Sequence, residues 1–530
     1  MDSPIKESDE SVQPDVEMPN AVSRVTVWLD RAIIFWLLMF AISAPHSIAG
    51  AQASWLCGML FWALRFLFPP RPRLWRTPLD YALLGFIVLT VISSLFSYDQ
   101  SASIGKLRAA SLFTIVYLVA GNVRDKRVLR LLTLALIASC MVSVFYTLGE
   151  RVAGRGVRIE EVANDSPLRA AIFVREDKTE DPTPIASGDT LLEVDGRAIG
   201  NPEELAAALD GSQTDDSLYA MVKIYRVEWT PLLKVPRGRL LEGATPLERL
   251  GVRRWTRGRE WRAAGFYGHY TTYAEALQLI ASLALGLFMA LRSKRGWPGR
   301  LLLLALLGLG GSLLLTVTRA SWLAFLLSVF VIVLAASRRR TAIIVAACAL
   351  PVVLAGLFVL QRQRNVGFYD QKDQSITWRE TVWREGFELL KSRPRHLLVG
   401  VGMDSIKSHW REWGLFDEGR LPIGHMHSTP LQLAVERGIP ALLAWIIFVI
   451  LYALMLLRLA RSRKASGWIE RGIVLGALGG LVGFIASGMV HYNFGDSEVV
   501  MIFYFIMGLT LAVERAAGSR NEPAPGPAGQ

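Results

Sequence analysis

The run GRLLLLALLGLGGSLLLTV at residues 299–317 is followed, after Thr318 and Arg319, by ASWLAFLLSVFVIVLAAS at 320–337. Beyond Arg300, no charged side chain interrupts either run. Roughly 20 apolar residues are enough for a helix to cross the hydrocarbon core of a bilayer. The stretch therefore predicts two membrane-spanning helices joined by a very short turn.

The same pattern recurs along most of the 530-residue chain. Hydrophobic residues make up 52% of the sequence and charged residues 20%, and the mean hydropathy is +0.34. Too few charged side chains remain to solvate ordinary soluble domains of this total size. We expect an α-helical polytopic membrane protein with about twelve transmembrane helices. The predicted spans lie near residues 29–49, 51–68, 80–97, 103–121, 128–148, 270–292, 299–317, 320–337, 341–361, 429–458, 471–490 and 497–515.

Basic residues are concentrated in the junctions that follow every second predicted span. They are Arg71, Arg73 and Arg76 after the second, Arg124, Lys126, Arg127 and Arg130 after the fourth, Arg292, Lys294, Arg295 and Arg300 after the sixth, Arg338, Arg339 and Arg340 after the eighth, and Arg458, Arg461, Arg463, Lys464 and Arg471 after the tenth. Loops rich in Lys and Arg stay in the cytoplasm. We therefore predict a bacterial inner-membrane protein with both termini cytoplasmic and disordered tails at 1–26 and 517–530. The net charge is +12, but many of the Lys and Arg residues lie in such junctions. The charge therefore does not indicate a nucleic-acid partner.

Two of the predicted extracytoplasmic loops, residues 149–269 and 362–428, are long. Loops of that length are usually functional or fold as domains of their own. In the first, an alternating run at 157–162, then Ser166-Pro167, then the stretch 188–196 resemble a PDZ domain of the bacterial envelope type. We place this small α+β PDZ-like periplasmic insertion at 149–236, a basic juxtamembrane segment at 237–269, and the membrane helices at 27–148, 270–361 and 429–516.

The PDZ resemblance implies that the insertion binds a protein C-terminus by adding it as a strand. In such domains, backbone amides before the first strand hold the terminal carboxylate, and Gly154, Gly156 and Val157 stand at that place. The sequence departs from the pattern in an extra acidic segment at 175–184. The alternative is a spacer that packs on the membrane domain and binds no ligand.

The second long loop ends in Gly424-His425-Met426-His427-Ser428-Thr429-Pro430. Thr429 is a good N-cap and Pro430 suits the first turn, so we expect the tenth span to begin here. His427 would then lie beside the positive end of a helix dipole, where an anion is favoured. Because histidine is also suited to proton transfer near neutral pH, we predict His427 as a catalytic residue. The alternative is a histidine that only caps the loop.

Two arginines are predicted on the same side of the membrane. Arg319 stands in the short turn between the seventh and eighth spans, where it costs free energy unless it meets an anion or extends to the interface. Arg379 precedes Trp383 by four residues on a helix expected to lie on the membrane surface. Both guanidinium groups suit bidentate phosphate binding; a salt bridge from Arg379 to Glu380 or Glu385 is the alternative.

Other candidate positions are less specific. Gly400-Val401-Gly402 indicates a close backbone approach but lacks the pattern of a phosphate loop. Arg262 ends a basic run that could meet lipid headgroups or acceptor phosphates, or could simply face solvent, and His491 follows the eleventh span on the extracytoplasmic side. No metal-binding motif and no serine-hydrolase motif is present in the sequence, so we expect no metal. The basic run comprises Arg253, Arg254, Arg257, Arg259 and Arg262.

Taken together, these motifs resemble the O-antigen ligase/polymerase superfamily. The resemblance rests on Arg319, Arg379, the Gly400-Val401-Gly402 turn and His427-Ser428, which Gly438 follows with the spacing H-S-x9-G. Residues 264–269, which end in His269, also resemble the segment that leads into the corresponding helix of that family. The resemblance covers the membrane core, and the PDZ-like insertion lies outside it.

The resemblance implies a metal-independent glycosyltransferase without cofactors that acts at the periplasmic membrane face. Its donor would be a glycan linked to undecaprenyl diphosphate, and its acceptor lipid A–core or another molecule. Arg319 and Arg379 would bind the diphosphate and stabilise its developing charge. His427 would activate the acceptor hydroxyl or position the diphosphate. His269, Arg262, His491, Gly400 and Gly402 would bind substrate.

Several functions remain open at this point. O-antigen ligation to lipid A–core leads, followed by O-antigen polymerisation and by transfer of the glycan to a protein, which the insertion could recruit. A transporter or an envelope scaffold is the non-enzymatic alternative. Transporters carry ionisable residues near the middle of the membrane, whereas the candidates here gather at one face, which disfavours transport.

Overall fold

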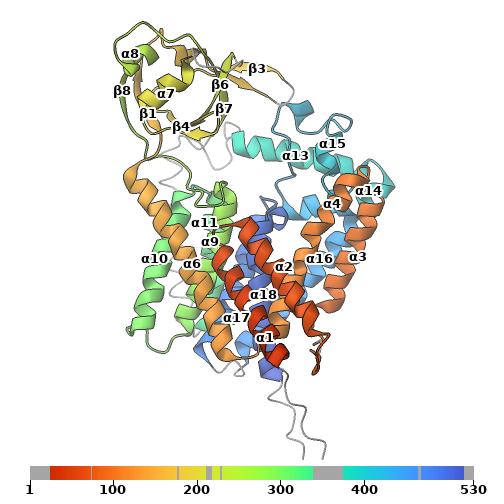
Figure 1. Ribbon diagram of the computed structural model, residues 1–530. Coiled ribbons are helices and arrows are strands. Elements are labelled where there is room, and N and C mark those ends of the chain that lie inside the picture. Colours follow the sequence, from red (N-terminus) through yellow and green to blue (C-terminus); the bar gives the residue numbers. More distant parts are fainter. Residues whose placement is uncertain are drawn as a thin grey trace, which may run out of the picture.

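The computed structural model describes residues 24–72, 75–175, 178–210, 218–226, 230–337, 374–462 and 467–518. A bundle of long helices carries a β-rich module at one end (Figure 1). The module connects to the bundle through α6 (Lys126–Ala153) and through the segment that leads into α9 (Tyr270–Ala290). Short helices before α16 (Thr429–Arg461) cover the same end of the bundle (Figure 1).

Each predicted span that falls on described residues contains a helix. Nine of the described helices are long and apolar enough to cross a membrane, which indicates a membrane-embedded protein. The ninth predicted span, 341–361, lies outside the described residues, so the count of about twelve stays a prediction. The remaining bundle helices are α1 (Arg24–Ser43), α2 (Ile48–Arg65), α3 (Asp80–Leu95), α4 (Gln100–Ala110), α5 (Thr114–Asn122), α10 (Trp297–Leu315), α11 (Arg319–Ala336), α17 (Trp468–Gly488) and α18 (Ser497–Gly518).

Helices α9 and α17 form the centre of the bundle and are buried along most of their length. Glycines allow their backbones to approach closely. A Cβ atom added at Gly286 would lie 2.3 Å from the carbonyl oxygen of Gly472. Small residues at helix interfaces allow tight packing in membranes, where no hydrophobic effect drives helices together.

The module contains an antiparallel sheet in the order β3-β2-β7-β6-β4-β1-β8, with β5 paired to β4. Its core consists of alternating apolar residues, for example the fully buried Ile159, Leu191 and Val222. The elements are β1 (Val157–Val162), β2 (Ile172–Val174), β3 (Glu180–Pro182), β4 (Thr190–Val194), β5 (Arg197–Ala198), α7 (Pro202–Leu209), β6 (Tyr219–Tyr225), β7 (Leu232–Pro236), α8 (Pro246–Leu250) and β8 (Val252–Arg257).

The sheet extends past the boundary predicted at residue 236. Strand β8 lies in the predicted juxtamembrane segment and pairs with β1 from Val157↔Arg257 to Val162↔Val252. Val252 is buried, whereas Arg253 and Arg254 are exposed. The exposed arginines made this segment resemble a solvated basic run and concealed the strand.

Strand β8 also changes the expectation for peptide binding. Both edges of β1 are paired within the chain, to β4 and to β8, so a peptide could add to β1 only by displacing one of them. The residues before β1 have partners as well. The Arg155 amide donates to the Gly258 carbonyl at 2.8 Å. A Cβ atom at Gly156 would lie 2.3 Å from the Leu191 carbonyl oxygen, so this glycine permits close packing between strands.

The described part of the second long loop, from residue 374 onward, contains helices α13 (Gln374–Lys391), α14 (Pro394–Val399) and α15 (Ser405–His409). Figure 1 shows all three at the end of the bundle that carries the module. Val382 and Leu390 of α13 are buried, and Phe387 is exposed, which agrees with the predicted amphipathic helix.

Candidate active site

Helix α16 begins where the sequence predicted, directly after His427, with Pro430 in its first turn. The N-cap is Ser428 rather than the predicted Thr429. The Thr429 hydroxyl instead contacts the His491 carbonyl at 3.1 Å and the Asn493 side-chain oxygen at 2.9 Å. These contacts tie the start of α16 to the segment between α17 and α18.

The helix is interrupted at Gly438, whose φ of 82° breaks the α-helical geometry. The nine residues between Ser428 and Gly438 therefore form a separate helical segment, which accounts for the spacing H-S-x9-G. Amides of the loop after α14 bind the last carbonyls of this segment, Val401 N to Val435 O and Gly402 N to Glu436 O, both at 2.9 Å. Those carbonyls would otherwise lack helical partners.

Gly400 and Gly402 both pack closely against other parts of the chain, and their role in substrate binding stays a prediction. A Cβ atom at Gly400 would lie 2.3 Å from the Glu436 carbonyl carbon, and one at Gly402 would lie 1.9 Å from the Ser97 hydroxyl. Both positions pack against the protein itself. The predicted close backbone approach is present, at Gly400 toward α16 and at Gly402 toward Ser97, which precedes α4.

Three histidines and one tryptophan gather at the start of α16. The ring of His427 lies 4.0 Å from that of His425, 4.2 Å from that of Trp378 and 6.0 Å from that of His491, measured between centroids. The rings of His425 and His491 are 5.3 Å apart. We refer to His425, His427 and His491 as the histidine cluster.

His427 is largely buried and is held in its neutral form. Burial lowers its pKa well below the usual range, and the charges of its histidine neighbours and of Arg379 lower it further. The imidazole is therefore neutral at physiological pH. Its Nδ1 atom is buried and has no hydrogen-bond partner among the described residues. The φ of His427 is 47°, an uncommon backbone conformation for a residue other than glycine.

Arg379, on α13, belongs to the same cluster. Its Nε donates to the carbonyl oxygen of Val490 at 3.2 Å, directly before His491. Burial first, then the charges of His491 and of more distant groups that include Arg379, lower the pKa of His425 to about 3. The carboxylate of Glu385, one of the alternative partners predicted for Arg379, accepts instead from the amides of Phe416 and Asp417.

Arg262 connects the turn of Arg319 to this cluster. Arg319 is the first residue of α11, and the preceding turn places Val317 at a φ of 51°. Arg262 Nη2 donates to the Val317 carbonyl at 3.1 Å, and its guanidinium lies 4.1 Å from the centre of the Tyr270 ring. His269 is the N-cap of α9; burial first, then the charges of His491 and Arg262, lower its pKa to about 4.

The sequence did not single out Glu275, Asp496 or His425, which complete this surface. Glu275 of α9 lies 3.2 Å from Nδ1 of His491, and Asp496 accepts a hydrogen bond from Thr272 at 2.9 Å. A carboxylate inside a predicted membrane span is itself a signal of function, and Glu275 carried that signal. His425, two positions before His427, could have been found from the repeated histidine alone.

Two groups of side chains are close enough together to share a metal ion. The ligand atoms of His425, His427 and His491 lie within 4.8 Å of one another, as do those of Glu275, His491 and Asp496. Neutral imidazoles are common metal ligands. The first group, however, also experiences the positive charge of Arg379, which opposes a cation and favours an anion.

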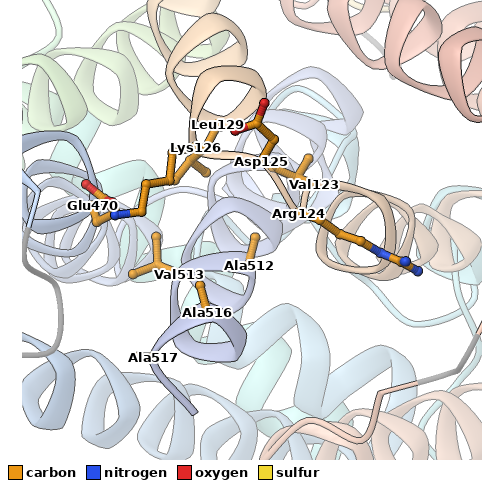
Figure 2. Close-up of a pocket in the computed structure, with 10 residues that line it drawn as sticks. All are labelled: Val123, Arg124, Asp125, Lys126, Leu129, Glu470, Ala512, Val513, Ala516 and Ala517. Atoms are coloured by element: carbon orange, nitrogen blue, oxygen red, sulfur yellow. Dashed lines mark ion pairs between the residues drawn. The ribbon is translucent and has the colours of Figure 1, made fainter. Parts of the chain in front are cut away.

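A small pocket lies at the other end of α6 from the module. Figure 2 shows its lining, including Arg124 and the ion pair between Lys126 and Glu470 at 3.0 Å. The remaining residues around it are mostly apolar. None of the predicted site residues lines this pocket, so we place the candidate site at the start of α16.

Comparison with known families addresses the same segment. Residues 304–446 match the model of a family described as O-antigen ligase. The match supports the O-antigen ligase superfamily. It includes Arg319, Arg379, His427 and Gly438, and therefore supports glycosyl transfer of the O-antigen ligase/polymerase type. No curated protein matches the chain.

Proposed function

We propose that the protein transfers a glycan from undecaprenyl diphosphate to lipid A–core, as an O-antigen ligase of the bacterial inner membrane acting at its periplasmic face. The observation that carries the proposal is the neutral, buried His427 beside Arg379 at the start of α16. This combination offers a proton acceptor and an anion-binding group in one place. The family match to residues 304–446 supports the same class of reaction.

The chemistry assigns a separate task to each group. The bond between the anomeric carbon of the glycan and the diphosphate oxygen breaks, and the diphosphate leaves with the electron pair. Arg379 and Arg319 stabilise the negative charge that develops there. A hydroxyl of the acceptor forms the new bond to the anomeric carbon, and its proton passes to the imidazole of His427. Arg262 and His269 extend the same basic surface toward the acceptor.

This scheme uses no metal ion. The arginines supply the positive charge that a divalent cation supplies in other transferases. We expect that the activity of purified membranes survives treatment with EDTA with less than about a twofold change, since no step depends on a bound cation. A loss that added Zn²⁺ or Mg²⁺ restores would show that the histidine cluster holds a metal instead.

The test of function is a deletion strain that expresses either the wild-type protein or a variant. We expect the deletion to produce lipopolysaccharide without O-antigen and to accumulate long lipid-linked polymer. His427→Ala and Arg379→Ala should fail to restore attachment although both proteins reach the membrane at normal levels. A core capped with a single repeat would identify a polymerase. Normal lipopolysaccharide together with an unglycosylated protein would identify a protein glycosyltransferase, and no glycan phenotype would favour a transporter or scaffold.

A further inference from the structure

Glu275 and His491 form a buried charged pair within the candidate site. Glu275 stands in the second turn of α9 and is 1% exposed, and its Oε1 lies 3.2 Å from Nδ1 of His491. The contact meets the distance of an ion pair without the angle of an aligned hydrogen bond. A carboxylate buried in a membrane helix is costly unless it is paired or serves a function. His491 is the charged partner that Glu275 faces at this distance.

Acidic groups and basic groups lie on different sides of His491. Asp496, before α18, is the second acidic neighbour. His425 and His427 face it from the loop before α16, Arg379 from α13, and His269 from the start of α9. His491 therefore stands between two carboxylates and the basic part of the site.

This arrangement distinguishes His491 from the other histidines of the site. Burial alone would lower the pKa of His491, but the charge of Glu275, its contact with the ring and the charge of Asp496 outweigh burial and raise it. The pKa values of His425, His427 and His269 are all lowered. The site thus combines a neutral imidazole at His427 with a second imidazole that favours its protonated form.

We propose that Glu275 is a positioning residue that holds His491 as a fixed positive charge in the wall of the site, where His491 binds the lipid diphosphate together with Arg379. This inference rests on the proposed function, because it assigns a further binding group for the same donor. It also accounts for a carboxylate inside a membrane helix. Glu275 itself does not touch the diphosphate.

The experiment measures binding of undecaprenyl diphosphate to the purified full-length protein in nanodiscs between pH 7 and 9. Wild-type affinity should fall as the pH rises, because His491 loses its proton. Glu275→Gln removes the charge that favours the protonated ring. We therefore expect this variant to bind about tenfold more weakly at pH 7, a loss of about 1.4 kcal/mol. Its affinity should also be nearly independent of pH. The double variant Glu275→Gln/His491→Gln, which leaves no unpaired charge behind, should behave in the same way.

Glu470→Gln is the matched control, because it also removes a carboxylate from an ion pair but at the opposite end of α6, beside Lys126. It should bind like the wild type at every pH. Arg379→Ala tests the proposed function separately. If the wild type does not bind undecaprenyl diphosphate, or if Arg379→Ala does not weaken binding, the proposed function is wrong.

If Arg379→Ala weakens binding but the double variant keeps the wild-type affinity and pH dependence, the pair between Glu275 and His491 is structural, and only this inference fails. The double variant decides the matter even if Glu275→Gln alone does not fold. A change of wild-type affinity on addition of Zn²⁺ or EDTA would also overturn the inference, since His491 would then be a metal ligand.

Discussion

His427 combines a left-handed backbone conformation, a buried ring nitrogen and a lowered pKa at the start of a membrane helix. This backbone conformation costs free energy in a residue other than glycine, and proteins retain it mainly where function requires it. The ring of Trp378 and the neighbouring His425 fix the position of the imidazole. His427, the residue proposed to take part in the reaction, therefore also has a strained backbone conformation.

Substitution of His427 tests its role as proton acceptor. We expect His427→Gln to lower the rate of glycan transfer at least about 100-fold, the usual contribution of a general base. The rate would be measured in membrane vesicles with lipid-linked donor. His409→Gln is the control, because His409 stacks on Trp413 in the same segment before α16 but outside the histidine cluster. Equal losses in both variants would assign His427 a structural role only.

The lowered pKa values of the histidines also predict how stability depends on pH. His425 and His269 titrate at about 3 and about 4 in the folded protein and near 6.5 when unfolded. Protonation therefore favours the unfolded chain, so this stability is complete above pH 6.5 and is lost as the pH falls toward those values. We expect the melting temperature to drop between pH 7 and pH 5, and His425→Gln to reduce the drop by about 1–2 °C. An unchanged drop would contradict this reading of His425.

At the scale of elements, the break in α16 at Gly438 determines the position of the helix N-terminus. The first segment is short, and the loop at Val401 and Gly402 holds its C-terminal carbonyls. A side chain at position 438 would meet the Leu398 carbonyl oxygen at 2.4 Å. Gly438 is thus required for packing. The motif H-S-x9-G therefore contains a candidate catalytic residue, His427, and a structural residue, Gly438.

Gly438→Ala should therefore reduce the amount of folded protein. A strained φ and the clash with Leu398 together cost on the order of 2–3 kcal/mol. Thermal unfolding in detergent would measure the loss. Gly310→Ala on α10 is the control, since a Cβ atom there meets no atom within 4 Å and the change should be neutral or slightly stabilising. Gly438→Ala with wild-type stability would contradict the assignment.

The β-rich module begins and ends at points of the chain that lie close together. The Arg155 amide lies 2.8 Å from the Gly258 carbonyl, so a short linker can join these two ends. We expect a protein in which a Gly-Ser linker replaces residues 156–257 to remain folded in the membrane, whereas deletion of 156–236 would leave β8 without its partner. Size-exclusion profiles of the two proteins check this. Retained glycan transfer after excision would assign the module to acceptor choice, and lost transfer would assign it to the reaction.

At the scale of the whole molecule, helix α13, which carries Arg379, lies at the end of the bundle that carries the module (Figure 1). Basic junctions predict that this end is periplasmic. We expect alkaline phosphatase inserted after Gly243 to be active and green fluorescent protein fused to the C-terminus to fluoresce. Swapping the two reporters should abolish both signals. Any other pattern would place the candidate site in the cytoplasm and contradict a lipid-linked periplasmic donor.

Local sequence patterns predicted much of this molecule because the bilayer and the backbone constrain short segments directly. Apolar length determined the helices, including the pair separated by Arg319. Alternation indicated the strand at Val157–Val162. Thr429 and Pro430 marked the start of α16, although the N-cap proved to be Ser428. Strand β8 was missed because its arginines face solvent, and a charged surface strand has no periodicity of its own that separates it from a basic loop.

The sequence by itself determined the membrane helices, the start of α16 and the presence of His427 and Arg379, because each depends on residues close together in the chain. Only the tertiary structure decided that His491 lies between His427 and Glu275, that Gly400 packs against α16, and that β8 covers β1. Such contacts join segments far apart in sequence. Their free energy comes from packing and charge pairing that no local pattern encodes.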